Sequence, residues 1–114
     1  MSAITTHVLD TSTGKPAAGV PVVLERNTHT AGWQREAESL TDANGRINDL
    51  LGPTYPFLPG HYRLTFDVGP YFLLRNIETF YPKITVHFVV KDAQQHYHVP
   101  LLVSPFGYSS YRGS

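Results

Sequence analysis

The chain has 114 residues, a formal net charge of zero and no cysteine, which excludes disulfides, thiolate chemistry and zinc sites built on Cys. Nucleic-acid binding is not expected because the sequence carries no basic excess. The 41% hydrophobic content predicts one globular domain over residues 1–114, and with neither a signal-peptide pattern nor an apolar run of about 18–20 residues we expect a cytoplasmic protein without membrane contact.

Short strands separated by turn signals are predicted along the whole chain. Clusters of Gly, Pro and Asn separate segments in which apolar and polar residues alternate. The predicted strands cover residues 4–10, 20–26, 33–39, 61–67, 84–90 and 96–103, with a further short strand around 108–112. Such spacing is typical of an all-β antiparallel sandwich or barrel of seven to eight strands.

One short helix and two irregular features interrupt this pattern. Tyr71, Leu74 and Ile77 have helical spacing, so we expect one or two helical turns within residues 70–78, before Pro82. The charged alternation of residues 33–39 indicates an edge strand or a solvated face. Asn44 and Gly45 tolerate positive φ and predict a tight turn that leads into Arg46.

The strand at residues 96–103 has two faces that differ in kind. Side chains alternate along a strand, so one face is an ordinary core face of Tyr97, Val99, Leu101 and Val103. The opposite face carries His96 and His98 together with Pro100 and Leu102. The strand at residues 4–10 repeats the arrangement, with His7 and Leu9 on the face opposite Thr6 and Val8. Each strand therefore has a second, partly apolar surface, which a small domain can bury by oligomerising.

Polar groups on strands allow three interpretations. Histidines in an intersubunit groove titrate near neutral pH and can activate water, with Arg46 as an anion or carbonyl clamp. Alternatively, His7, His96 and His98 are structural or solvated side chains. The His-x-His spacing also permits a zinc site of these three imidazoles. His29, His61 and His87 are expected on the solvated surface.

Four segments in order resemble a known family, the transthyretin-related 5-hydroxyisourate hydrolases. The segments are His7-Val-Leu-Asp10 with Gly14-Lys-Pro-Ala17, then Thr41-Asp42 with Gly45-Arg46, then His96-Tyr-His-Val-Pro-Leu-Leu102 with Ser104-Pro105, and the ending Tyr111-Arg112-Gly113-Ser114. The resemblance covers essentially the whole chain. It implies a transthyretin (prealbumin)-like β-sandwich assembled as a homotetramer, a dimer of dimers with active sites at the dimer–dimer interface.

The resemblance also implies an activity and its residues. Members of this family hydrolyse 5-hydroxyisourate to 2-oxo-4-hydroxy-4-carboxy-5-ureidoimidazoline in urate catabolism, without a metal or other cofactor. His7, Arg46 and His98 match the catalytic positions, and Tyr111 matches a substrate-contacting one. Ser114 and His96 are further expected substrate contacts. The alternative is a non-catalytic transthyretin-like carrier of a small aromatic ligand, although paired imidazoles are not needed for that role.

Overall fold

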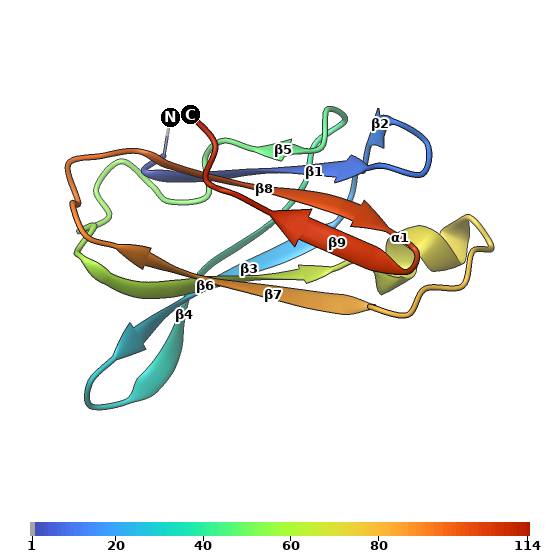
Figure 1. Cartoon of the computed structure of the whole chain (residues 1–114). Helices are drawn as coiled ribbons and strands as arrows, with labels where there is room; N and C mark the ends of the chain where they lie inside the picture. The colour runs from blue at the N-terminus through green and yellow to red at the C-terminus, as the bar shows by residue number, and fades with distance from the viewer. Residues whose placement is uncertain (1) are drawn as a thin grey trace.

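Apolar residues at alternate positions give most of the long strands one buried face, and two sheets bury these faces against each other (Figure 1). The computed structural model describes residues 2–114. The first sheet has the order β2 (Lys15–Pro16), β1 (Ile4–Asp10), β8 (Tyr97–Ser104) and β9 (Gly107–Ser110), and β5 (Arg46–Ile47) also pairs with β1. The second has the order β4 (Gly32–Leu40), β3 (Pro21–Thr28), β6 (Gly60–Asp67) and β7 (Lys83–Val90). The predicted all-β sandwich is therefore confirmed.

The pairing of β1 with β8 is parallel, whereas the other strand pairs are antiparallel. Its register runs from Ile4 opposite Tyr97 to Asp10 opposite Val103. These two strands come from opposite ends of the sequence and lie side by side in the middle of the first sheet (Figure 1). The arrangement brings the two histidine-bearing strands together.

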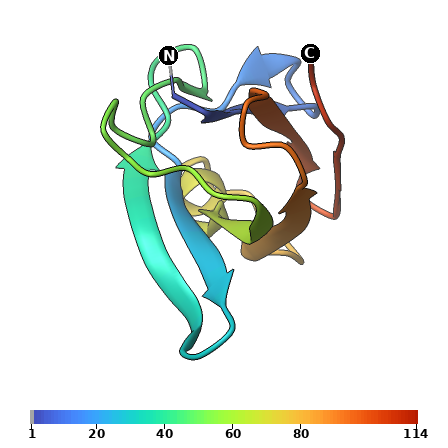
Figure 2. The same ribbon diagram turned by 90° about the vertical axis from the view of Figure 1, so that its left-hand side faces the viewer.

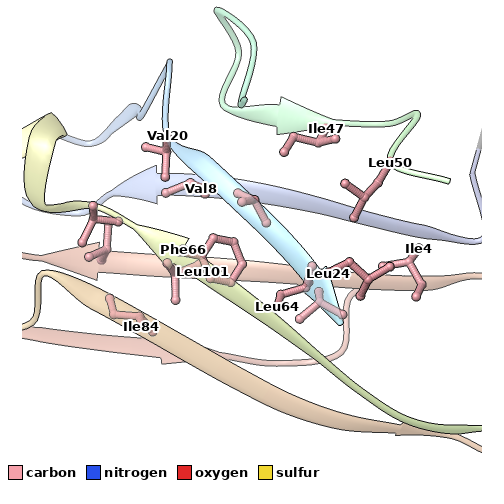
Figure 3. Packing of buried hydrophobic residues seen from close by; sticks show 14 of the residues in the cluster. Ile4, Val8, Val20, Leu24, Ile47, Leu50, Leu64, Phe66, Ile84 and Leu101 are labelled. Carbon is pink, nitrogen blue, oxygen red and sulfur yellow. The ribbon is translucent and has the colours of Figure 1, made fainter. Parts of the chain in front are cut away.

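The core fills the space between the sheets (Figure 3). Its largest fully buried side chains include Tyr62, Phe66 and Phe72. The inward positions expected for the strands at residues 4–10, 61–67 and 96–103 are buried, as alternation predicts. Truncating one of these side chains, such as Leu64, to Ala would cost about 2–5 kcal/mol of stability.

The short helix predicted within residues 70–78 is present, at Gly69–Leu74. Helix α1 spans Gly69–Leu74, and its buried residues are Tyr71 and Phe72 rather than a stripe through Leu74. Leu74 is 85% exposed, and the chain leaves the helix before Ile77, with Asn76 at a φ of 58°. A helix of six residues has fewer than two turns, so it cannot maintain a longer apolar stripe. No helix within residues 2–114 is long and apolar enough to span a membrane.

The strand boundaries differ from the prediction mainly at short elements. Residues 2–114 form nine strands rather than the predicted seven to eight. Strand β2 has two residues and was not predicted, because so short a segment shows no alternation. Strand β5, also of two residues, begins at Arg46, directly after the predicted turn. The last strand, β9, ends at Ser110 rather than at residue 112. Strand β4 lies at the edge of its sheet, as its charge pattern indicated, and the β3–β4 hairpin extends beyond the sandwich (Figure 2).

Candidate active site

The parallel register of β1 and β8 places two histidines on one outer face of the first sheet. Thr5 lies opposite His98, and His7 lies opposite Pro100. His7 and His98 are half-buried, whereas the inward neighbours Val8 and Val99 are buried in the core. The predicted catalytic histidines are therefore diagonal neighbours across two strands.

Arg46 reaches this face from the other side of β1. Strand β5 pairs with β1 so that Arg46 lies opposite His7. The turn before it is closed by Asp42, whose carboxylate accepts hydrogen bonds from the backbone N–H groups of Asn44 and Arg46, each at 2.9 Å. The backbone N–H of Asp42 in turn donates to the carbonyl oxygen of Arg46 at 2.9 Å. Arg46 itself is exposed, so its guanidinium faces solvent beside the histidines.

Gly45 and Thr41 explain why this turn needs its particular residues. Gly45 has a φ of +74°, and a Cβ atom there would lie 2.5 Å from the carbonyl oxygen of Val8. Only glycine permits both the left-handed conformation and so close an approach to β1. The buried Thr41 hydroxyl donates to the carbonyl of Ala17 at 2.7 Å and accepts from the backbone N–H of Val20 at 2.9 Å. The Thr41-Asp42 and Gly45-Arg46 segments thus fix Arg46 against β1.

Thr5 is a member of the site that the sequence did not reveal. Its side chain is on the same face as His7, and the residue is only 2% exposed. The hydroxyl oxygen lies 2.7 Å from Nδ1 of His98 and 3.0 Å from Nε2 of His96. The two imidazole rings are nearly parallel, with centroids 6.4 Å apart. His96 is exposed and precedes β8, so it shares a side with His98 as alternation predicted.

The C-terminal segment packs against His98 through its backbone. The N–H of Gly113 donates to the carbonyl of His98 at 2.8 Å. A Cβ atom on Gly113 would lie 2.6 Å from Cδ2 of the His98 ring, so only glycine fits there without moving the imidazole. Arg112 anchors the segment beside His96, because its guanidinium donates to the carbonyl oxygen of His96 at 3.2 Å. Its guanidinium donates to the Gln95 side chain and lies 4.3 Å from the centroid of the Tyr97 ring.

Two predicted substrate contacts, Tyr111 and Ser114, lie on this C-terminal segment. Tyr111 is 57% exposed, and the register shared by the β8–β9 pairs and the His98–Gly113 bridge places it across from Pro100. Ser114 is exposed and follows Gly113. Both positions therefore belong to the part of the chain that borders His98.

Asp10, the last residue of the His7-Val-Leu-Asp10 segment, holds two elements of the fold together. Asp10 is fully buried, and its carboxylate accepts hydrogen bonds from the Tyr71 hydroxyl at 2.8 Å and from Ser12. Burial acts to raise the pKa of Asp10, but these hydrogen bonds outweigh it and lower that pKa. The carboxylate ties β1 to α1 on the side away from the histidines.

Burial and positive charge lower the pKa of both imidazoles, which favours their neutral forms. Burial lowers the pKa of His98, and the charges of Arg46, His96 and His7 lower it further. Burial also lowers the pKa of His7, followed by the effect of Arg46, although a backbone hydrogen bond at Asn44 and the Asp42 carboxylate act in the opposite direction. Neutral imidazoles can accept a proton from water, which a catalytic base requires.

The remaining histidines lie elsewhere. His29, His61 and His87 are exposed, as expected, and His61 and His87 contact each other on the second sheet, with 2.8 Å between ring nitrogens. Within residues 2–114 no three His, Cys, Asp or Glu side chains are close enough to hold a metal ion.

Comparison with known proteins places this arrangement in context. The protein named 5-hydroxyisourate hydrolase in Salmonella dublin is 47% identical over 111 residues, which cover 97% of this chain and 80% of that protein. The structure of Klebsiella pneumoniae 5-hydroxyisourate hydrolase matches with a TM-score of 0.83 at 38% identity, covering 97% of this chain and 98% of that one. Sea bream transthyretin in complex with thyroxine matches with a TM-score of 0.90 at 30% identity, covering 98% and 95%.

These neighbours confirm the transthyretin-like class of the sandwich. The family described as HIUase/Transthyretin matches residues 4–113, which include His7, Arg46 and His98. The strand pairing, the histidine-bearing outer face and the matched length agree, and the chain belongs to the HIUase/Transthyretin family.

Proposed function

We propose that this protein hydrolyses 5-hydroxyisourate to 2-oxo-4-hydroxy-4-carboxy-5-ureidoimidazoline, a step of urate catabolism in the cytoplasm. The observation that carries the proposal is the convergence of two imidazoles, each with a lowered pKa, and one guanidinium on a single sheet face. Relatives that match nearly the whole chain, such as the Salmonella dublin protein, are named for this activity.

The proposed mechanism uses water as the nucleophile. One imidazole, of His7 or His98, takes a proton from water while the water oxygen bonds to the carbonyl carbon of the ring amide. Arg46 orients the planar substrate and offsets the negative charge that develops on the carbonyl oxygen. The ring C–N bond then breaks, and the other imidazole supplies a proton to the leaving nitrogen. Tyr111, Ser114 and His96 contact the substrate at the border of the site.

The site is proposed to be completed by a second subunit. In one protomer Arg46 is exposed and the histidines are half-buried, so this face alone does not enclose a ligand. Leu9 and Leu102 lie on the same face and are also half-buried. A homotetramer that pairs two such faces, as a dimer of dimers, would exclude water and strengthen every charge interaction with the substrate.

The competing function is a carrier of a small aromatic ligand. It is favoured by the match to sea bream transthyretin, whose structure contains thyroxine. Mixing urate with urate oxidase, then adding this protein, separates the two by stopped-flow absorbance. A hydrolase accelerates the disappearance of the 5-hydroxyisourate intermediate, whereas a carrier leaves its spontaneous decay unchanged. Repeating the assay after exhaustive EDTA treatment tests the zinc alternative, and we expect full activity.

A further inference from the structure

The Thr5 hydroxyl lies between the imidazole of His98 on β8 and that of His96, which precedes β8. Thr5 has no role in the mechanism above. It is 2% exposed and lies within hydrogen-bonding distance of Nδ1 of His98 and Nε2 of His96. A hydroxyl carries one hydrogen, so it donates to one of these nitrogens and accepts from the other. The direction of donation along the His96–Thr5–His98 hydrogen bonds therefore determines which ring nitrogen of neutral His98 carries the hydrogen.

The two possible directions give His98 opposite chemistry. If Thr5 donates to His96, then His98 donates from Nδ1 and has a bare Nε2, which is a base. If Thr5 donates to His98, then His96 donates to Thr5 and the neutral His98 carries its hydrogen on Nε2, which is an acid. The distances favour the second direction. Hydroxyl donors make shorter hydrogen bonds than N–H donors, and the contact to His98 is 2.7 Å against 3.0 Å to His96.

We propose that Thr5 and His96 are positioning residues that make His98 the proton donor of the reaction and leave His7 as the base. The inference rests on the proposed hydrolysis for its kinetic consequence. It assigns the two histidines to separate steps: His7 takes the proton of the attacking water, and Nε2 of His98 gives its proton to the leaving nitrogen.

The hydrogen-bond chain replaces the proton that His98 loses. As Nε2–H of His98 is transferred, the Thr5 hydroxyl hydrogen moves to Nδ1, and Nε2–H of His96 moves to the Thr5 oxygen. His96 is exposed and takes a hydrogen from solvent at Nδ1. After the products leave, the proton held by His7 passes through solvent to Nε2 of His98, and the hydrogen-bond chain runs back. The Nδ1 hydrogen of His98 returns to the Thr5 oxygen, the Thr5 hydrogen returns to Nε2 of His96, and the Nδ1 hydrogen of His96 returns to solvent. Each ring ends neutral, and the products carry the atoms of one added water.

Replacing the hydroxyl without changing the side-chain shape tests the proposal. Thr5→Val removes the hydrogen bonds but keeps the β-branched shape, and Thr5→Ser restores the hydroxyl. We expect Thr5→Val to lower kcat about 10- to 100-fold, less than most of the roughly 10²–10⁴-fold that acid–base catalysis contributes, because the His98 imidazole itself remains, with KM unchanged. Thr5→Ser retains near wild-type kcat. The control is Thr85→Val, which makes the same substitution on β7 in the opposite sheet. We expect it to leave kcat unchanged.

Nitrogen-15 NMR of the imidazoles tests the direction independently of turnover. We expect the wild-type His98 ring to carry its hydrogen on Nε2, and Thr5→Val to shift the ring towards a mixture of tautomers. A wild-type hydrogen on Nδ1, or a Thr5→Val kcat within twofold of wild type, would overturn the proposal. If Thr5→Val does not fold, His96→Ala tests the proposal instead, because His96 is exposed. We expect His96→Ala to lower kcat several-fold, and an unchanged kcat would contradict the proposal. If the wild-type protein has no hydrolase activity, the proposed function is wrong. The NMR measurement of the His98 tautomer still tests the direction of the hydrogen bonds in that case.

Discussion

At the residue scale, one cation acts on both candidate catalytic histidines. Arg46 on β5 lies opposite His7 on β1. Its charge lowers the pKa of both His7 and His98, although burial lowers each pKa more. The same guanidinium suits an anionic or carbonyl oxygen. In the proposed mechanism, Arg46 therefore acts both on the pKa of the histidines and on the substrate.

Truncation of either histidine tests these roles. We expect His7→Ala and His98→Ala each to reduce turnover by about 10²–10⁴-fold, because each removes a proton-transfer group. Steady-state turnover of fresh 5-hydroxyisourate is the measurement. His29→Ala, an exposed histidine in the turn after β3, is the matched control and should leave turnover unchanged. Near wild-type turnover in His7→Ala or His98→Ala contradicts the assignment.

The pH dependence should follow from Arg46. A base works only when neutral, so activity falls as the pH drops through the lowered histidine pKa, which lies below the ordinary value of 6.5. Arg46→Gln removes one of the charges that lower this pKa. The acid limb of the kcat/KM profile should therefore move to higher pH, in addition to the loss of rate. An acid limb that stays in place would show that Arg46 does not act on the histidines.

Strand alternation was sufficient to predict that His7, His96 and His98 lie on non-core faces. It did not reveal Thr5, because the contact of Thr5 with His98 requires the parallel register of β1 and β8. A sequence pattern contains no information on which two strands pair or in which direction. A threonine two positions before His7 on the same face was the only available signal.

At the element scale, two irregular segments position side chains of the candidate site. The turn closed by Asp42 holds Arg46 against β1, and the C-terminal segment holds the His98 ring through Gly113. The sequence predicted the turn from Asn44 and Gly45. It did not predict the role of Gly113, because the clash that excludes a side chain there depends on a ring 15 residues earlier in the chain.

Gly113→Ala tests the C-terminal segment. The added methyl group would lie 2.6 Å from the His98 ring, so the imidazole or the segment must move. We expect a fall in kcat of about 10-fold or more, since small displacements of a catalytic group are costly, with an unchanged free energy of unfolding. Gly107→Ala in the same part of the chain is the control, because its methyl group would meet only ordinary contacts. Equal kcat values for the two variants contradict a positioning role for Gly113.

At the scale of the whole molecule, the outer face of the first sheet is incomplete as a binding site. It carries Leu9 and Leu102 beside exposed Arg46, and the proposed tetramer would bury it. Composition and alternation predicted the sandwich and this second surface. The outward Leu74 shows the limit of such patterns, because the helical spacing that predicted the short helix does not establish which of its residues are buried.

A charge on this face should break both assembly and activity. Leu102→Glu places a carboxylate where the proposed interface is apolar, so we expect smaller species in analytical ultracentrifugation and loss of turnover. Leu74→Glu, at an 85% exposed position on α1, is the matched control and should sediment like the wild type. A Leu102→Glu variant that remains tetrameric and active would show that this face is not the interface.

The central claim is that this histidine face hydrolyses 5-hydroxyisourate, and a stopped-flow experiment tests it most directly. Fresh 5-hydroxyisourate is mixed with wild-type protein, with His98→Ala, or with buffer, and the absorbance decay of the substrate is followed. The account predicts a decay that accelerates in proportion to wild-type concentration and nearly returns to the buffer rate with His98→Ala. A wild-type decay equal to that in buffer would contradict it.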